Sequence, residues 1–399
     1  MFSVEGVTLS MLIVEPERHA VLPVSPTDWL DRHLERICLL SELTPTQYRN
    51  AEAKYRAVGE WLGLPGSGLA PFWPEIFAQG SMAHGTTVRP YNPLHEHDLD
   101  LVCQLHYCGH EDPVHVYERV YNRLAEHETY RQMLERMKRC LRLNYAAAFH
   151  LDILPACPNG GLGPGAIVVP DCKLKSWKDS NPKGLTAWFL DACKRREVIQ
   201  ERVFKASIEP LPSPVPSEFK YPLQRIVQLM KRHRDIFFSG GRDIARSVIL
   251  TTLAGDCYQG ERSLSRALAS ILETIHTQLA VHPLVPVIPN PVHPGENFAD
   301  TWDQEKYDKF KAYISNFRTQ FGSVLRLQES SVRKGMEAAS DPLGKLFGSD
   351  RVKEAIRKEA GEINERRDGG SLAVTTAGLL AARSTPGTIP IARTQFYGR

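Results

Sequence analysis

The stretch PEIFAQGS at residues 74–81 and the stretch DLDLVCQL at residues 98–105 decide the fold of this chain. The first is a short apolar run that ends on Gly80-Ser81, a pattern that indicates a strand entering a tight turn. The second alternates polar and apolar residues in its first half, as a half-buried strand does. Residues i and i+2 of a strand point to the same face, so Asp98 and Asp100 are predicted to lie together.

A third carboxylate lies in the apolar, strand-like run of residues 142–154. Asp152 is flanked there by Leu151 and Ile153, and a buried carboxylate is unfavourable unless it is paired or bound to a metal. Three carboxylates around two Mg²⁺ or Mn²⁺ ions are suited to in-line phosphoryl transfer, because one ion activates the attacking hydroxyl and the other steadies the leaving pyrophosphate. The sequence therefore predicts Asp98, Asp100 and Asp152 as catalytic metal ligands.

The Gly-Ser pair is predicted to contact the phosphates of a nucleotide. Gly80 lets the backbone approach closely, and Ser81 offers an N–H and a hydroxyl. Taken alone, a Gly-Ser pair is most often a turn, and an Asp-x-Asp is most often solvated surface. Their order along the chain, followed by an acid inside an apolar strand, favours an active site.

Elsewhere the patterns predict a mixed first half and a mostly helical second half. Residues 27–64 are predicted to be helical, and residues 222–238 carry a strong apolar stripe at helical spacing. The predicted fold is α+β, a sheet lobe followed by a helical second lobe. The predicted divisions are an N-terminal extension (1–26), a catalytic lobe (27–190), a helical lobe (191–368) and a flexible C-terminal tail (369–399).

Composition sets limits on location and partners. The formal net charge of +3 is too small to predict nucleic-acid binding by itself. No apolar run approaches the roughly 18 residues that span a bilayer, and the N-terminus lacks the form of a signal peptide, so a cytoplasmic protein is expected. The eight cysteines form no C-x-x-C pair, which favours free thiols in a reducing compartment.

Four segments, in order along the chain, resemble the polymerase-β-type nucleotidyltransferase superfamily. More narrowly, they resemble the bacterial cyclic-oligonucleotide synthases (CD-NTases), relatives of cyclic GMP-AMP synthase and 2′,5′-oligoadenylate synthetase. The segments are QGSMAHGTTVRP (79–90), WKDSNPKGLTAWF (177–189), LQRIVQLMKRHRD (223–235) and the run from NPV to ENF (290–298). One feature departs from simple nucleotidyltransferases: a longer gap separates Ser81 from Asp98, and its insert at 91–97 is expected to form a loop.

The resemblance implies template-independent synthesis of a cyclic di- or trinucleotide second messenger from nucleoside triphosphates, ATP among them, in anti-phage (CBASS) defence. It also implies that the sheet lobe is a nucleotidyltransferase lobe, with the active site in the cleft between the two lobes. The nucleotide site would be made of Gln79, Gly80, Ser81, Lys231 and Ser247. Lys231 would act as a mobile point charge for phosphate, although a Lys on a helix is more often solvated. Arg232, His233 and Arg234 are expected to be mainly surface charge.

Two other functions remain open at this stage. The first is an enzyme that makes linear oligoadenylate or adds nucleotides to RNA ends, which would need a basic groove for the acceptor strand. No strong Lys/Arg cluster occurs beyond residues 231–234, so no stable nucleic-acid partner is expected. The second is a catalytically inactive scaffold, against which the presence of all three acids argues.

The C-terminal tail is expected to bind a partner. From Gly369 the composition turns to Gly, Ser, Thr, Ala and Pro, which bury little apolar surface, yet residues 389–399 regain apolar and aromatic anchors. Some enzymes of the family that this chain resembles end on an aromatic-Gly tail and are attached to other molecules, in operons that encode a ubiquitin-activating-like protein. The alternative is that Phe396 and Tyr397 pack on the enzyme itself.

Overall fold

The computed structural model describes most of the chain from Trp29 onward. The described residues are 29–91, 97–108, 111–145, 149–173, 175–195, 220–241, 244–328, 332–375, 380–382 and 388–390. They divide into a large unit, Trp29–Glu362, and a small one that begins at Ile363. The predicted N-terminal extension and the centre of the insert, residues 92–96, lie outside the described residues.

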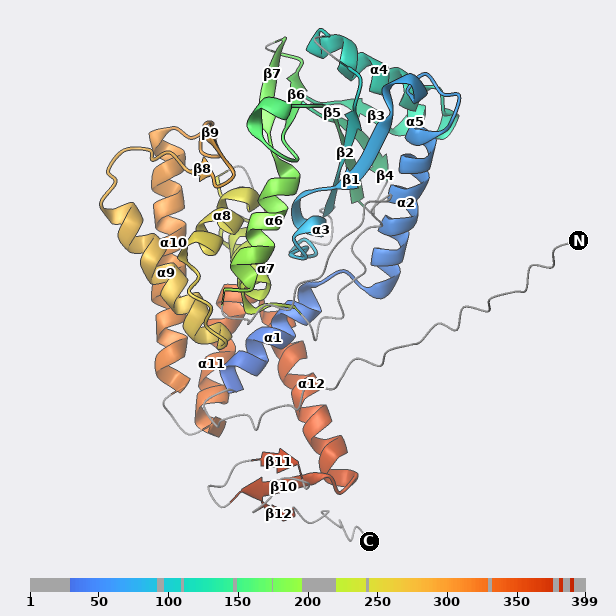
Figure 1. Cartoon of the computed structure of the whole chain (residues 1–399). Coiled ribbons are helices and arrows are strands. Elements are labelled where there is room, and N and C mark those ends of the chain that lie inside the picture. The colour runs from blue at the N-terminus through green and yellow to red at the C-terminus, as the bar shows by residue number, and fades with distance from the viewer. Residues whose placement is uncertain are drawn as a thin grey trace, which may run out of the picture. The chain divides into compact units, whose positions relative to one another are not determined.

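A seven-stranded mixed sheet is built by the first half of the large unit (Figure 1). Its strands run in the order β1-β2-β5-β4-β3, and β6 pairs with both β5 and β7. Only the β2–β5 pair is parallel among these strands. The strands are β1 (Pro74–Ala78), β2 (His97–Leu105), β3 (Leu134–Arg136), β4 (Leu141–Tyr145), β5 (Phe149–Pro158), β6 (Ile167–Asp171) and β7 (Ser176–Ser180).

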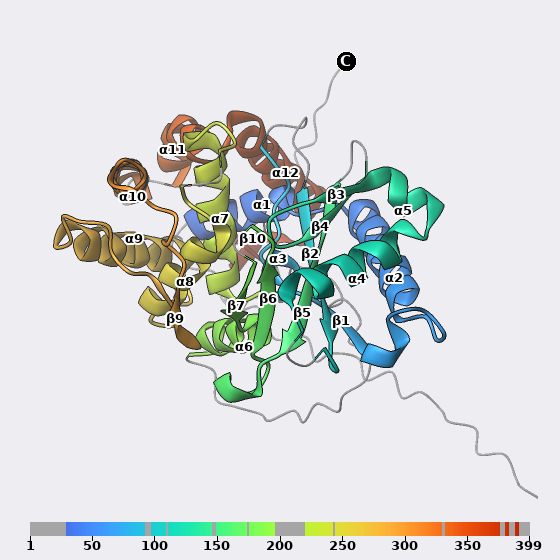
Figure 2. The ribbon, with the colours of Figure 1, turned by 90° about the horizontal axis from the view of Figure 1, so that it is seen from above.

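Three helices cover one face of this sheet, namely α2 (Pro45–Gly63), α4 (Pro113–Ala125) and α5 (Glu128–Met133). Seen from above, they lie on one side of the sheet and the remaining helices of the large unit on the other (Figure 2). Their apolar residues form one buried core with those of β2, β4 and β5. Two 3₁₀ turns, η2 (Ala70–Phe72) and η3 (Gly160–Leu162), lie in the connections.

The second core is helical, and α7 (Pro222–Phe237) runs through it. Helix α7 contacts α1, α6, α8, α9, α10 and α11, and thirteen of its residues, Leu223 to Asp235, are buried. Helix α1 precedes the sheet in sequence but packs in this helical core. The other elements are α1 (Trp29–Ser41), α6 (Pro182–Cys193), α8 (Ser247–Cys257), α9 (Leu264–Ala280), β8 (Pro289–Asn290), β9 (His293–Asn297), α10 (Gln304–Gln328), α11 (Val332–Phe347) and α12 (Ser349–Asp368).

The α+β prediction is confirmed, with two local differences. The helical run 27–64 is two helices, because Thr44 caps a new helix with its side chain and Pro45 follows at the first helical position. The strand-like run 142–154 is two antiparallel strands, β4 and β5. Apolar residues keep their spacing on both sides of each break, so the sequence pattern alone did not show that one helix or strand ends and another begins.

The small unit contains a three-stranded antiparallel sheet in the segment predicted to be a flexible tail. Its strands are β10 (Leu372–Thr375), β11 (Leu380–Ala382) and β12 (Thr388–Pro390), in the order β11-β10-β12. Part of the tail therefore has regular structure. Residues 391–399, which include the aromatic-Gly end, lie outside the described residues.

Two expectations from composition have different outcomes. Within the described residues, no helix is long and apolar enough to cross a membrane. The expectation of eight free thiols is wrong for one pair, because Cys108 is bonded to Cys157 with a Cα–Cα distance of 6.1 Å. Their separation of 49 residues hides the pairing in the sequence, whereas the parallel β2–β5 pair brings the two ends together. The other six cysteines are free.

Candidate active site

Strands β2 and β5 bring the three predicted carboxylates together. Asp98 and Asp100 lie on β2, and the parallel register places Asp100 directly opposite Asp152 of β5. Burial, together with the nearby charges of Asp152 and Asp98, raises the pKa of Asp100 to about 7, although the charges of Lys231 and Arg142 oppose this shift. The three acids therefore interact electrostatically, and ionisation of Asp100 is costly.

The Gly-Ser turn lies directly against Asp100. Gly80 begins the short helix α3 (Gly80–Ala83) with a φ of +63°, and a Cβ at this position would come within 2.7 Å of Asp100 Oδ2. Only glycine fits both the backbone conformation and the space. The N–H of Gln79 donates to the carbonyl of Asp100 at 3.0 Å, which fixes the turn to β2.

Asp152 is held by an arginine that the sequence analysis missed. Arg142 donates from Nε to Asp152 Oδ1 at 2.7 Å and from Nη2 to Oδ2 at 2.8 Å. The two residues are directly opposite each other in the β4–β5 register. The only sequence signal was a charge in an apolar run, and its partner becomes visible only when the run is divided into two antiparallel strands.

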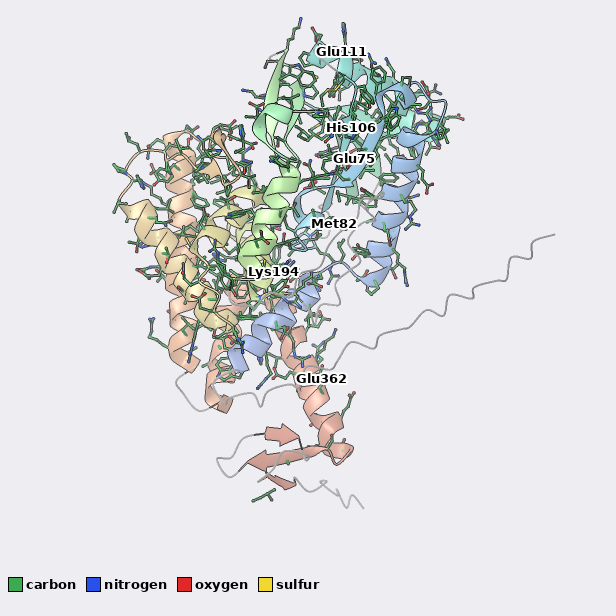
Figure 3. All side chains as sticks on the ribbon, in the orientation of Figure 1. Glu75, Met82, His106, Glu111, Lys194 and Glu362 are labelled. Atoms are coloured by element: carbon green, nitrogen blue, oxygen red, sulfur yellow. A yellow bond between two sulfur atoms is a disulfide. The ribbon has the colours of Figure 1, made fainter. Side chains whose placement is uncertain are left out.

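Side chains at the sheet edge connect it to the helical part. Glu75 of β1 and His106, which follows β2, lie side by side (Figure 3), with His106 Nε2 3.1 Å from Glu75 Oε2. Lys183 of α6 donates to the other oxygen of Glu75 at 2.6 Å. These contacts are partly exposed and link β1 to α6.

A cavity of about 280 Å³ opens beside the Gly-Ser turn. Its walls come from the sheet side, from helices α6, α7 and α8, and from the β8–β9 hairpin, which matches the predicted cleft between sheet and helices. It is lined by Gln79, Gly80, Ser81, His84, Asp100, Ser180, Asn181, Pro182, Leu185, Lys231, Arg246, Ser247, Val248, Thr251, Asn290, Glu296 and Phe298. All five predicted nucleotide-binding residues and Asp100 therefore border one cavity.

Lys231 reaches this cavity from inside the protein. It is 2% exposed, and its Nζ donates to the hydroxyl of Thr86 at 2.9 Å and to the Thr86 carbonyl at 3.2 Å. Burial and the charge of Lys231 lower the pKa of the neighbouring His84 to about 3, so that imidazole is neutral near pH 7. Lys231 thus supplies a positive charge to the cavity wall.

The expectation that Arg232, His233 and Arg234 are surface charge is wrong. Each is at most 3% exposed, because helices surround α7 and leave it no solvated face. Buried polar partners replace water: Arg234 pairs with Asp235 at 2.6 Å. Arg234 also donates to Ser247 Oγ at 3.0 Å, and this fixes the hydroxyl at the first position of α8 beside the cavity.

The β8–β9 hairpin contributes an amide and a carboxyl group to the far wall. Asn290 is 2% exposed, and its Nδ2 donates to Glu296 Oε2 at 2.8 Å. Burial raises the pKa of Glu296, although the hydrogen bond from Asn290 opposes this shift. The sequence analysis quoted this segment only for its resemblance, and the tertiary structure adds its place in the cavity.

The three acids fit the divalent cations that the sequence resemblance implies only in part. Within the described ranges, no group of three His, Cys, Asp or Glu side chains converges closely enough to hold a metal, and Arg142 occupies both oxygens of Asp152. The Asp98–Asp100 pair fits a cation better, since a divalent ion would offset the repulsion and burial that raise the pKa of Asp100. Asp152 would have to release Arg142 before it could bind an ion.

Together, a glycine turn against paired strand aspartates and a cavity with a buried lysine define a nucleotidyltransferase. A domain family described as Second Messenger Oligonucleotide or Dinucleotide Synthetase matches residues 37–192. The chain is 33% identical over 379 residues to a c-di-GMP synthase of Roseivirga ehrenbergii, covering 92% of this chain and 97% of that protein. The chain belongs to the bacterial CD-NTase family of cyclic-oligonucleotide synthases.

Two further comparisons agree with this assignment. The cyclic dinucleotide synthase CdnG of Bradyrhizobium diazoefficiens is 28% identical over 309 residues, which covers 70% of this chain and 71% of that one. The solved structure of a CdnG from that species in complex with GTP superposes with a TM-score of 0.64 at 22% identity, covering 83% of this chain and 98% of that one. The second comparison shows the shared fold.

Proposed function

We propose that this enzyme joins two guanosine triphosphates into a cyclic dinucleotide by two-metal nucleotidyl transfer. The observation that carries the proposal is the single cavity that Asp100, the Gly-Ser turn and Lys231 share. The names of two relatives support a dinucleotide product, one of them with guanine bases. They favour GTP over the ATP that the sequence resemblance suggested.

The residues of this chain have separate roles in the proposed reaction. Lys231 neutralises charge on the donor triphosphate, and the N–H groups and hydroxyl of the Gly80-Ser81 turn bind the same phosphates. Asp98, Asp100 and Asp152 would hold two divalent cations, which when bound activate the attacking hydroxyl and neutralise the leaving pyrophosphate. The linear dinucleotide then turns over in the cavity, and the second bond closes the ring.

Glu296 supports the choice of guanine. A carboxylate accepts hydrogen bonds from the N1–H and the amino group of guanine, whereas adenine presents an acceptor at N1. Asn290 uses Glu296 Oε2 and orients the carboxyl group. We propose that Glu296 reads the Watson–Crick edge of one guanine in the cavity.

The decisive experiment is product analysis from purified enzyme. Each triphosphate alone and in pairs is supplied with Mg²⁺ or Mn²⁺, and products are identified by mass spectrometry after phosphatase treatment. The proposal expects a phosphatase-resistant cyclic dinucleotide from GTP without any template. A product that keeps a terminal phosphate, or one that forms only with added RNA, would instead support linear or RNA-end synthesis.

Bacterial anti-phage defence is the biological setting that we propose for this activity, on the basis of the family alone. Cells that carry the complete operon should resist phage better than cells with an Asp100→Asn enzyme. The readout is plaque number on matched strains. Equal plaque numbers would remove the defence role without affecting the proposed chemistry.

A further inference from the structure

Three arginines from distant parts of the chain gather away from the nucleotide cavity. Arg89 follows the Gly-Ser segment, Arg232 lies on α7, and Arg351 lies in the first turn of α12. Burial lowers the pKa of Arg232 to about 10, and the charges of Arg351 and Arg89 act in the same direction. Burial, followed by the charge of Arg351, also lowers the pKa of Arg89. The three guanidinium groups are therefore close enough to repel one another.

Arg232 is the buried member of this cluster. It is 3% exposed, its Nε donates to the Phe347 carbonyl at 3.0 Å, and its guanidinium lies 4.8 Å from the centre of the Tyr91 ring. Its Nη1 has no hydrogen-bond partner in the part of the chain that the structure describes. A buried charged donor without a partner is costly, so a ligand that accepts this hydrogen bond would gain affinity from it.

The cluster lies at the N-terminus of a long helix. Gly348 directly precedes α12, and a Cβ built on it would come 3.2 Å from Arg232 Nη2. The first N–H groups of a helix lack intrahelical acceptors, and the macrodipole adds positive potential at this end. A buried guanidinium at this position increases a positive field that α12 already provides.

Nearby acids compensate only part of this charge. Glu354 lies 3.6 Å from Arg351 and also raises the pKa of Arg89. Asp235 favours the charged form of Arg232, but its Oδ1 is bonded to Arg234. Asp350, in the first turn of α12, is exposed. Arg89 donates from Nη2 to the Leu40 carbonyl, while its buried Nε has no partner among the described residues.

We propose that Arg89, Arg232 and Arg351 form a second anion site, which binds a phosphate group of inorganic phosphate or of a small phosphorylated metabolite. Guanidinium groups bind phosphate oxygens through paired, charge-assisted hydrogen bonds. Arg232 follows Lys231 on α7, and adjacent helical residues point about 100° apart, so one helix serves both sites. None of the three arginines lines the nucleotide cavity, and the site does not depend on the proposed product.

Titration calorimetry of the full chain with inorganic phosphate, in chloride buffer of constant ionic strength, tests this site. Wild type should show saturable binding with one phosphate per chain. Arg351→Gln and Arg89→Gln, whose side chains are only partly buried, should each weaken binding by about tenfold or more. Arg357→Gln provides the matched control, because Arg357 is exposed on the same helix and should leave binding unchanged.

The Lys231→Met variant tests whether phosphate binds in the nucleotide cavity instead. This variant should keep phosphate binding at the arginine cluster. The proposal is overturned if wild type shows no saturable binding, if Arg351→Gln binds as wild type does, or if Lys231→Met abolishes binding. If short RNA binds through the same arginines but phosphate does not bind, the proposal is also overturned, and the cluster is a nucleic-acid-binding surface. If glycerol phosphate binds more tightly than inorganic phosphate, the ligand is a phosphorylated metabolite. If glycerol phosphate binds more weakly, the ligand is free phosphate.

Discussion

Asp100 carries the strongest constraint at the scale of single residues. It lies against Gly80 and opposite Asp152, and its raised pKa indicates that its charge is unfavourable without a cation. A group kept for catalysis at a cost in stability is typical of active sites. Two predictions follow from this one carboxyl group, one for activity and one for stability.

Replacing Asp100 with Asn should reduce nucleotide incorporation by at least about 100-fold, because the amide cannot neutralise a divalent cation. Radiolabelled GTP incorporation at saturating Mg²⁺ measures the effect. Glu305→Gln, a change to an exposed acid of α10, should retain the wild-type rate. Asp100→Asn with full activity would disprove the metal-ligand role.

The same substitution should stabilise the metal-free protein at high pH. The folded pKa of Asp100, about 7, lies above its ordinary value of 3.8, so the folded state binds the extra proton and its stability falls as pH rises between these values. The gain in the free energy of unfolding from Asp100→Asn should be small at pH 4. Above pH 7 it should be constant, at roughly 1.4 kcal/mol for each unit by which folding raises the pKa of Asp100. Urea unfolding with EDTA at both pH values measures it, and an equal gain at both would contradict the assigned pKa.

Glu296→Gln should lower the preference for GTP over ATP. The amide keeps the size of the side chain but loses one of the two acceptors that match guanine. The ratio of kcat/KM for GTP to that for ATP should fall by about tenfold, the effect of about one lost hydrogen bond. Glu305→Gln is again the control. An unchanged ratio would limit Glu296 to bracing the hairpin through Asn290.

At the scale of elements, α7 is the part of the structure that joins the catalytic sheet to the helical core. Its Gln224 donates to the His84 carbonyl at 2.8 Å and its Lys231 to Thr86, both in the segment after the Gly-Ser turn. Its Arg234 fixes Ser247 of α8. One buried helix therefore positions the turn, the lysine and the serine of the proposed nucleotide site.

Lys231→Met should raise the KM for GTP by about tenfold or more, because a buried cation that binds triphosphate is lost. Met fills similar space without a charge that must be buried, which offsets the loss of the two hydrogen bonds to Thr86, so the melting temperature should change little. Initial rates and thermal unfolding measured together test both parts. A fall in stability with unchanged KM would show that Lys231 serves only to hold Thr86. Lys309→Met, on the surface of α10, is the matched control.

At the scale of the whole molecule, the tail is the part of the chain that we expect to act on partners. Removing residues 391–399 leaves β12 and its pairing with β10 intact. The truncated enzyme should keep its rate in vitro but lose covalent attachment to other molecules in cells that carry the complete operon. Immunoblots for higher-mass species, beside the purified rate, measure this. A large loss of rate or stability on purification would show that the tail packs on the enzyme.

The sequence by itself determined the strand aspartates, the Gly-Ser turn and the α+β class, because alternation along a strand and glycine chemistry are local properties. It also brought Lys231 and Ser247 into the site, through the family resemblance. Only the tertiary structure decided which side chains lie opposite these residues. The Arg142–Asp152 pair, the Cys108–Cys157 bond and the burial of α7 on all sides depend on which strands and helices become neighbours. That choice is made by non-local packing, which residue spacing along the chain does not record.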